Sequence, residues 1–195
     1  MSLLTTFSAA LEARDPYLRG HSARVTGFAE ALARMLGRKP RELETLRLGG
    51  SLHDVGKIAV NASVLRKPGP LTDDELAQIR RHPVAGAHLI EGVVELRKAL
   101  PYVLHHHERW DGRGYPDGKA GEEIPLEARV LGVADAFDAM TSARPYRPAL
   151  TVEAALGEIE RCGGTQFDPE LARAFVRGWE TGEIGGAELP AAASA

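Results

Sequence analysis

Apolar side chains recur at intervals of three and four residues along most of the chain. Such runs cover residues 3–11, 25–36 and 43–53, and the second run stops before Gly37 and Pro40. This period belongs to one face of an α-helix, and glycine and proline commonly follow helix ends. The pattern therefore predicts that the first part of the chain is helical.

Later segments carry helix boundaries as well as a helical period. Thr72 and Glu75 form a capping-box pattern for a helix running toward His82, where Pro83 is expected to kink or restart it. Apolar positions at 96–104 mark a further helix that leads into the histidines at 105–107. We therefore expect several short helices across this part of the chain.

The last third of the chain completes a helical pattern. Residues 126–140 are apolar nearly all round, which predicts a buried helix. Thr151 can cap a helix over 152–161, and Asp168-Pro169 is a typical helix start. The stretch from Arg109 to Pro125 has no helical period and is predicted to be an irregular loop.

These elements define the expected architecture. No convincing alternating run of strand type occurs, so the predicted fold class is all-α. We expect one helical domain of about seven to eight helices over residues 1–182. A Gly/Ala-rich tail, which is expected to be frayed, follows over residues 183–195.

Composition narrows the classes of function. The chain has 195 residues and a net charge of −3, so it lacks the polybasic character expected of a DNA-, RNA- or membrane-binding surface. Cys162 is the single cysteine, which excludes an intrachain disulfide and favours a cytosolic setting. No signal peptide or transmembrane stretch is recognisable. We therefore expect a soluble, cytoplasmic protein.

Several polar side chains fall on the apolar faces of these predicted helices. His21 lies one turn before Val25 on the apolar stripe, and His53 lies on the inward face of its run. Asp135 stands in the middle of the apolar helix, and Asp138 follows on the same side. A buried carboxylate is costly unless a cation or a metal ion pairs with it.

Each of these residues alone has an ordinary alternative explanation. A single inward histidine is more often a hydrogen-bonded core residue, and one His-Asp pair is a weak signal. The concentration of such residues in one small domain favours metal binding instead. The set is His21, His53, Asp54, His82, His105, His106, His107 and Asp135. Imidazole and carboxylate without thiolate suit Fe, Mn, Zn or Ni, and one carboxylate could bridge two ions for hydrolysis.

An ordered series of motifs then carries a family resemblance. The motifs are Asp15-Pro16-Tyr17, His21-Ser22, Arg24-Val25, His53-Asp54-Val55-Gly56-Lys57, Lys67-Pro68-Gly69, Leu71-Thr72, His82-Pro83, His106 to Gly112, Gly114-Tyr115-Pro116, Asp135 to Thr141, and Arg144-Pro145-Tyr146-Arg147. In these residues the chain resembles the HD-GYP family, a branch of the HD phosphohydrolase superfamily. The resemblance covers about residues 11–175.

The resemblance implies an enzyme that hydrolyses cyclic di-GMP, a bacterial second messenger, to the linear dinucleotide pGpG or on to GMP. It implies a binuclear metal centre with the ligands His21, His53, Asp54, His82, His106, His107 and Asp135. Some members bind a third metal through a glutamate at the position of Tyr17, so two divalent ions are expected here. Fe or Mn is favoured, with Zn or Ni as alternatives. His88 and His105 are left without a ligand role.

The same resemblance implies roles in catalysis and phosphate binding. His53 and Asp54 would act through the metals, and Lys57 would reach the scissile phosphate as an electrostatic clamp or a proton donor. The alternative for Lys57 is a solvated surface side chain. Arg144 and Arg147 would contact the phosphates of the substrate, although ordinary salt bridges remain an alternative.

Further candidates for substrate contact are Tyr115, Asp15 and Asp138. The family associates the loop of Tyr115 with substrate contact and with partner diguanylate cyclase (GGDEF) domains, although Tyr115 could also pack under this loop. Asp15 and Asp138 could equally orient a metal ligand, cap a helix or form ion pairs. A homodimer is left open.

Three other functions compete with this interpretation. They are an HD enzyme for another nucleotide, such as cyclic GMP-AMP, a binding module without turnover, and a di-iron oxygenase. The Gly-Tyr-Pro loop and the Arg144 to Arg147 segment disfavour a generic HD enzyme but do not exclude mixed cyclic dinucleotides. The complete set of expected ligands favours an active enzyme, and the phosphate-binding residues disfavour an oxygenase.

Overall fold

The structure is a computed structural model that describes residues 20–143 and 148–185. The helix predicted over 3–11 lies outside these residues. So do Asp15, Tyr17, Arg144 and Arg147, together with most of the predicted tail.

The described residues form α-helices and short 3₁₀ helices, and apart from two isolated bridges they contain no β-structure. The α-helices are α2 (His21–Met35), α3 (Pro40–Leu52), α4 (Ala62–Leu65), α5 (Asp73–Arg80), α6 (His82–Ile90), α7 (Leu100–His105), α8 (Leu126–Thr141), α9 (Val152–Arg161) and α10 (Pro169–Glu180). The 3₁₀ helices are η2 (Val55–Ala59), η3 (Val94–Ala99) and η4 (Gly121–Glu123). The all-α prediction is confirmed.

Local capping explains where several helices begin. The Thr72 hydroxyl accepts a hydrogen bond from the Glu75 amide at 3.3 Å, and the Glu75 carboxylate accepts one from the Thr72 amide at 2.8 Å. This capping box starts α5, as the sequence predicts. The chain then restarts as α6 at His82, with Pro83 in the first turn where its missing N–H costs nothing.

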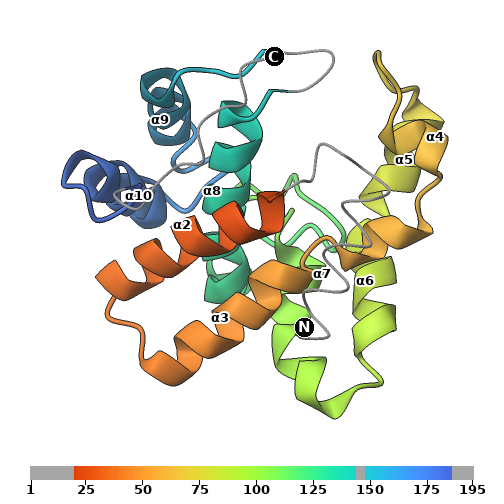
Figure 1. Ribbon diagram of the computed structural model, residues 1–195, viewed down its shortest axis with the longest axis horizontal. Coiled ribbons are helices and arrows are strands. Elements are labelled where there is room, and N and C mark those ends of the chain that lie inside the picture. Colours follow the sequence, from red (N-terminus) through yellow and green to blue (C-terminus); the bar gives the residue numbers. More distant parts are fainter. Residues whose placement is uncertain (1–19, 144–147, 186–195) are drawn as a thin grey trace.

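The main core surrounds α8, which is central in the molecule (Figure 1). α2 packs against both α3 and α8, while α9 packs against α8 and α10 packs against α2, α8 and α9. Phe28 and Phe137 meet edge to face with ring centroids 5.2 Å apart, and Phe175 packs against both. Burying such a side chain contributes about 1.5–3 kcal/mol, so this cluster fixes the position of α8 relative to α2.

A second, smaller core lies under α6 and α7 and contains Leu52, Val55, Ile90, Ala99 and Val103. α3 contributes side chains to both cores, because Leu43 and Leu46 belong to the first and Leu52 to the second. The end of α3 is therefore held between the two parts of the molecule. His53 and Asp54 follow directly after it.

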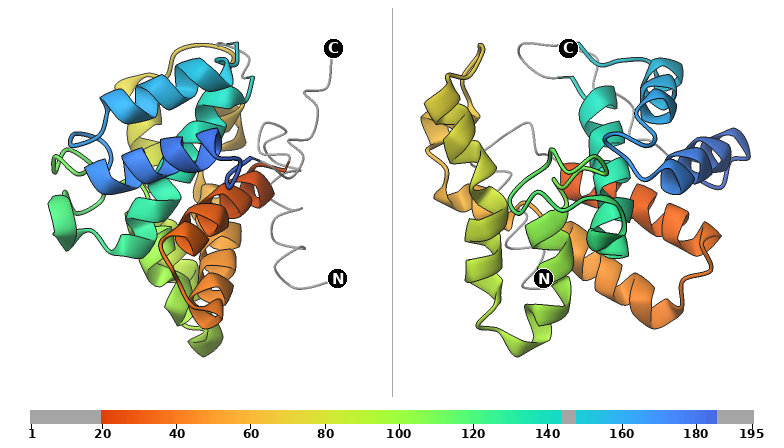
Figure 2. Two further views of the ribbon diagram at one scale, coloured as in Figure 1. Left: turned by 90° about the vertical axis from the view of Figure 1, so that its left-hand side faces the viewer. Right: turned by 180° about the vertical axis from the view of Figure 1, so that it is seen from behind.

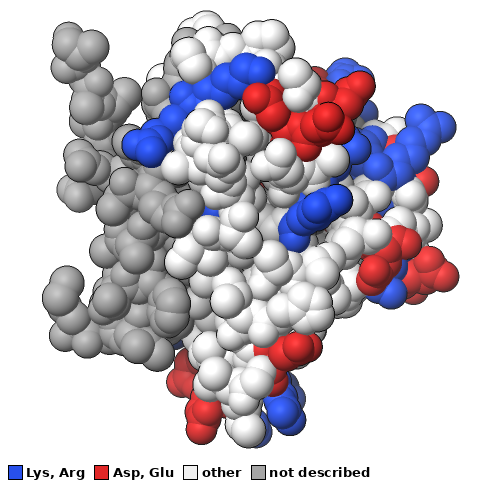
Figure 3. Space-filling view, turned by 90° about the vertical axis from the view of Figure 1, so that its right-hand side faces the viewer, with Lys and Arg blue, Asp and Glu red and all other residues white. Residues whose placement is uncertain are grey.

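The irregular segment between α7 and α8 crosses over α8 in the rear view (Figure 2). Its loop character agrees with the prediction for residues 109–125, apart from the short η4. On the face shown in Figure 3, acidic and basic side chains are interspersed. None of the described helices combines the length and the apolar character needed to cross a membrane.

Candidate metal centre

The predicted metal ligands come from separate segments that the fold brings together. His21 is the first residue of α2, and His53 and Asp54 follow α3. His82 begins α6, His106 and His107 follow α7, and Asp135 projects from α8. The donor atoms of all of these residues except Asp135 form two groups that share Asp54.

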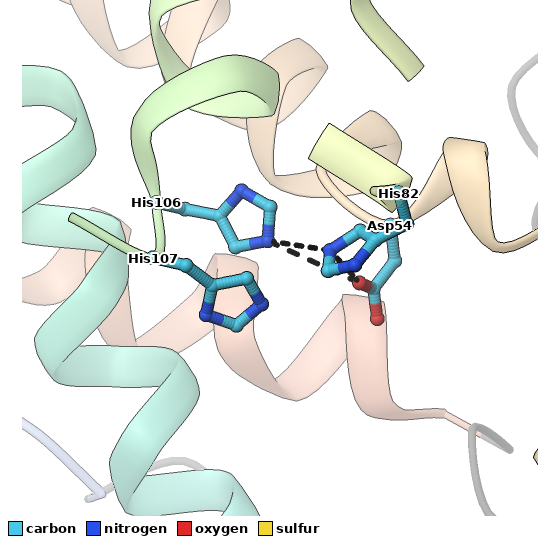
Figure 4. Close-up of side chains that lie close together, drawn as sticks. All are labelled: Asp54, His82, His106 and His107. Atoms are coloured by element: carbon cyan, nitrogen blue, oxygen red, sulfur yellow. Dashed lines mark hydrogen bonds and ion pairs between the residues drawn. The ribbon is translucent and has the colours of Figure 1, made fainter. Parts of the chain in front are cut away.

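The first group contains Asp54, His82, His106 and His107, with donor atoms within 4.8 Å of one another. His82 Nε2 lies 3.2 Å from His106 Nε2 and 3.3 Å from Asp54 Oδ1. Figure 4 shows the rings of His106 and His107 lying together and facing His82 and Asp54. These nitrogen atoms and one carboxylate oxygen converge as metal ligands do.

The second group contains His21, His53 and Asp54. His21 Nε2 and His53 Nε2 each lie 3.6 Å from Asp54 Oδ2, and His21 Nε2 lies 3.3 Å from Asp135 Oδ1. Asp54 therefore faces the first group with Oδ1 and the second group with Oδ2. This is the disposition of a carboxylate that bridges two metal ions.

Backbone carbonyl groups orient the histidine rings. His53 donates its Nδ1 hydrogen to the carbonyl oxygen of Gly50 at 2.7 Å, and His82 donates to Ile79 at 2.8 Å. His106 donates to carbonyl oxygens of its preceding turn at 3.0 Å. Because a carbonyl oxygen only accepts, these bonds leave each Nε2 atom available for a metal ion.

His21 is oriented differently, by a carboxylate. Its Nδ1 lies 2.8 Å from Asp138 Oδ2, and Arg24 in turn donates to both Asp138 oxygens at 2.5 and 3.0 Å. The Asp138 side chain is 2% exposed and that of Asp135 is 17% exposed. The fully buried carboxylate of α8 is thus Asp138 rather than Asp135, and it lies behind His21.

The residues present fit a pair of divalent ions. His53 Nε2 is buried and has no hydrogen-bond partner, which is unusual for a polar atom in a folded protein. A metal ion would satisfy this nitrogen atom. The surrounding imidazole and carboxylate groups suit Fe, Mn, Zn or Ni, as the sequence predicts.

The electrostatic state of the first group favours metal binding. Burial lowers the pKa of His82 to about 3 and that of His107 to about 4. Burial, with the neighbouring histidines, holds the pKa of His106 well below its usual range. All three rings are therefore neutral near pH 7, which is the form that binds a metal ion.

The carboxylates of the centre behave differently from the rings. Burial would raise the pKa of Asp54, but the positive charge of Lys57 and the surrounding histidines hold it well below its usual range. Burial also lowers the pKa of His21, yet the bonds to Asp135 and Asp138 outweigh burial and raise it to about 9. A metal ion at His21 must therefore displace a proton.

Lys57 lies at the edge of the centre. Its Nζ atom is 2.6 Å from Asp54 Oδ2, and its side chain is 18% exposed. This position needs Gly56, because a Cβ atom there would lie 1.9 Å from the carbonyl oxygen of His82 and 2.4 Å from the Gly86 nitrogen. This role of Gly56 was not predicted from the sequence, although Gly56 stands inside the His53 to Lys57 motif.

The Gly-Tyr-Pro loop folds over the first group. The Tyr115 ring stacks on His107 with centroids 4.9 Å apart, and the Arg80 guanidinium lies 5.6 Å from the Tyr115 centroid. A Cβ atom at Gly114 would lie 2.4 Å from the Arg109 nitrogen, so only glycine fits this turn. The sequence carried no signal for Arg80.

The two histidines without an expected ligand role lie outside the centre. His88 is exposed and pairs with Glu91 at 3.1 Å. His105 faces Glu108 and Asp117, neither of which is a predicted ligand. Among the predicted substrate residues, Tyr115 lies beside the centre, while Asp138 is buried behind a ligand.

Known proteins are similar to this chain in sequence and in fold. The family described as HD domain matches residues 5–171. The chain is 44% identical over 177 residues to the cyclic di-GMP phosphodiesterase response regulator RpfG of Xanthomonas campestris pv. campestris, covering 90% of this chain and 47% of that protein. It is 35% identical over 175 residues to the 3′3′-cGAMP-specific phosphodiesterase 3 of Vibrio cholerae, covering 90% and 38%.

A crystal structure supports the same fold. The cyclic GMP-AMP specific phosphodiesterase V-cGAP3 of V. cholerae aligns with 91% of this chain and 48% of its own, with a TM-score of 0.69 and 21% sequence identity. The chain thus spans less than half the length of each of these three relatives.

Proposed function

The chain belongs to the HD domain family, and we propose that it is a metal-dependent phosphodiesterase acting on cyclic di-GMP. Its membership of this family confirms the resemblance that the ordered motifs indicated. The observation that carries the proposal is the position of Asp54. Its two oxygen atoms face two separate histidine groups, which suits a binuclear hydrolytic centre.

Two divalent transition-metal ions, with Fe or Mn favoured, would be held by His82, His106 and His107 on one side, by His21, His53 and Asp135 on the other, and by Asp54 between them. When bound, such ions activate water at neutral pH and stabilise negative charge on a phosphate. The chain's own groups would do the remaining work.

Lys57 is suited to act on the scissile phosphate. Its ammonium group lies against Asp54, at the edge of the centre, and keeps some exposure. It would stabilise the developing negative charge or donate a proton to the leaving oxygen. Tyr115 would present its ring and hydroxyl beside His107 to a nucleotide held there.

The second phosphate of the substrate requires further cations. Arg144 and Arg147 are proposed to bind it, because guanidinium groups bind phosphate bidentately. The same residues would support hydrolysis of 3′3′-cGAMP, the substrate named for a relative 35% identical to this chain. Cyclic di-GMP is favoured because the relative at 44% identity is named for it.

The wider context is proposed on the same basis. The product is pGpG, with GMP after a second cleavage. The domain would act in the bacterial cytoplasm, and a diguanylate cyclase domain is a candidate partner. A homodimer is compatible with this function.

The decisive experiment is turnover after anaerobic reconstitution of the chelated protein with Fe²⁺ or Mn²⁺. Cyclic di-GMP and 3′3′-cGAMP would be compared, with the products separated by chromatography. We expect faster cleavage of cyclic di-GMP and none after chelation. Cleavage that survives Asp54→Ala, or binding of both dinucleotides without cleavage by the metal-loaded protein, would overturn the proposal.

A further inference from the structure

A second cluster of ligand-type side chains lies at the base of the Gly-Tyr-Pro loop. It consists of His105, Glu108 and Asp117, and one donor atom of each lies within 4.8 Å of the other two. His105 Nδ1 is 3.8 Å from Glu108 Oε1 and 3.7 Å from Asp117 Oδ2. The cluster shares no residue with the centre around Asp54.

The ring of His105 is poorly satisfied in this position. Its Nδ1 atom is buried and has no hydrogen-bond partner, and its side chain is only 11% exposed. Both nearby carboxylate oxygens lie beyond hydrogen-bond distance. A buried polar atom of this kind normally has a partner, and a cation between the three side chains would provide one.

The buried carboxylate of Glu108 also favours a cation at this cluster. Its side chain is fully buried and accepts hydrogen bonds from the amides of Asp117 at 2.8 Å and Lys119 at 3.1 Å. Among the described residues, neither a lysine nor an arginine forms an ion pair with Glu108. His105 is the only side chain among them that can carry a positive charge and has a nitrogen atom within 4.0 Å of the Glu108 carboxylate. A buried carboxylate is destabilising without a cation.

We propose that His105, Glu108 and Asp117 bind a divalent metal ion that is separate from the catalytic pair. One neutral imidazole and two carboxylates would balance a charge of +2. A nitrogen ligand with two oxygen ligands suits Zn²⁺, Mn²⁺ or Fe²⁺ better than Mg²⁺, which prefers oxygen atoms and water.

The distances from His105 require little movement. Ligands bound to Zn²⁺ at about 2.1 Å in a tetrahedron lie about 3.4 Å apart, so His105 Nδ1, at 3.8 Å from Glu108 Oε1 and 3.7 Å from Asp117 Oδ2, would approach each oxygen by a few tenths of an ångström. The Asp117 side chain is 49% exposed, which opens the cluster to ions and water from solvent. Water would complete the coordination shell.

Such an ion would join the two ends of the catalytic loop. His105 ends α7, and Asp117 follows Gly114-Tyr115-Pro116 in the loop. Fixing both ends would hold the Tyr115 ring against His107, where the two rings stack. The ion would thereby order the loop over the catalytic centre without taking part in the chemistry.

Metal titration of the chelated full chain tests this site without using turnover. In an Asp54→Ala background, which disables the catalytic centre, the protein should still bind one equivalent of Zn²⁺. Adding Asp117→Asn should weaken this binding at least tenfold, since even a hydrogen-bond partner of a ligand is worth about 10–100-fold in metal affinity. His105→Asn should have the same effect.

His88→Asn is the matched control, because His88 also faces a glutamate three residues later but lacks the third ligand. It should leave Zn²⁺ binding unchanged. If the Asp54→Ala protein does not fold, the comparison moves to the otherwise unchanged chain, where Asp117→Asn should remove one equivalent and His88→Asn none. Equal Zn²⁺ binding with and without Asp117→Asn would overturn the proposal and reduce the cluster to an ion pair.

Limited proteolysis gives a second measurement that depends on the loop. Trypsin cleavage after Arg113 and Lys119 should slow when Zn²⁺ is added to the Asp54→Ala protein. The protection should disappear with Asp117→Asn. Protection that persists in this variant would contradict the site.

Discussion

The two sides of Asp54 differ in how they present their ligands. The His82, His106 and His107 side offers three rings that are neutral near pH 7. The side of His21 and Asp135 is anionic, and a proton occupies His21 until pH rises to about 9. The first side is ready to accept an ion, whereas the second must exchange a proton for one.

The difference arises from the groups around each ring. Burial lowers the pKa values of His82 and His106, and the carbonyl oxygens that orient these rings add no charge to oppose it. Asp135 and Asp138 both lie against His21, and these carboxylates outweigh burial and raise the pKa of the ring. Local backbone therefore orients His53, His82 and His106, whereas the orientation of His21 depends on a carboxylate that is distant in the sequence.

The largest expected effect comes from removing the group that both sides share. Asp54→Ala should deplete both ions and lower turnover of cyclic di-GMP by more than about 10³-fold, since one lost electrostatic contact alone can cost that much. Elemental analysis and turnover measure the two effects. The control is His88→Ala, which should change neither, and normal activity of the Asp54 variant would refute the bridging role.

The next effect should be confined to one side. Asp138→Asn or Arg24→Ala should weaken the binding of one ion by about 10–100-fold and leave the other unchanged, because Asp138, which Arg24 holds in place, orients only His21 among the ligands. Titration with Mn²⁺ would resolve the two affinities. Arg34→Ala is the matched control on α2, since Arg34 pairs with Glu30 away from the centre. Equal weakening of both ions would show that the two sides are not separable.

A smaller effect is expected on substrate binding, with both groups of metal ligands unchanged. Arg144→Ala should raise the KM for cyclic di-GMP by about tenfold or more through the loss of a charged hydrogen bond, while the metal content stays near that of the unmodified chain. Steady-state kinetics and elemental analysis check this together. Loss of metal from this variant would mean that Arg144 supports the centre rather than the substrate.

The smallest effect is a pH dependence of the metal-free protein. The pKa of His21 is raised from 6.5 to about 9, so its stabilising contribution is complete below pH 6.5 and is lost as pH rises through about 9. The lowered pKa values of His82 and His107 have the opposite effect. Below pH 6.5 these two rings take up protons in the unfolded chain but not in the folded one, so the folded state loses stability as pH falls toward about 4 and 3. Tm of the chelated chain should therefore decline in both directions.

Two variants separate the alkaline decline of Tm from the acidic decline. His21→Asn should flatten the decline of Tm above pH 6.5 and leave the acidic decline, because the ring whose pKa is raised to about 9 is then absent. His82→Asn should reduce the acidic decline alone. An unchanged alkaline decline in the His21 variant would contradict the proposed proton at that side.

Much of the fold could be predicted because its signals are local. The capping box of Thr72 and Glu75 starts α5, and Asp168 caps α10 by accepting from the amides of Glu170 and Leu171 at 2.9 and 3.4 Å. The restart at His82 follows from Pro83. These signals act within one helical turn, so the order of residues contains them.

The sequence by itself determined the helices and the chemistry of the centre, because residue type and helical period are written along the chain. Tertiary structure decided what no local pattern contains. It set Asp138 and Arg24 behind His21, over a separation of more than a hundred residues, and it turned the two oxygens of Asp54 toward different histidines. It also required a residue without a Cβ atom at Gly56, because the backbone of α6 lies against it. These features depend on how remote helices pack, and packing distances are settled only when the two cores form around the end of α3.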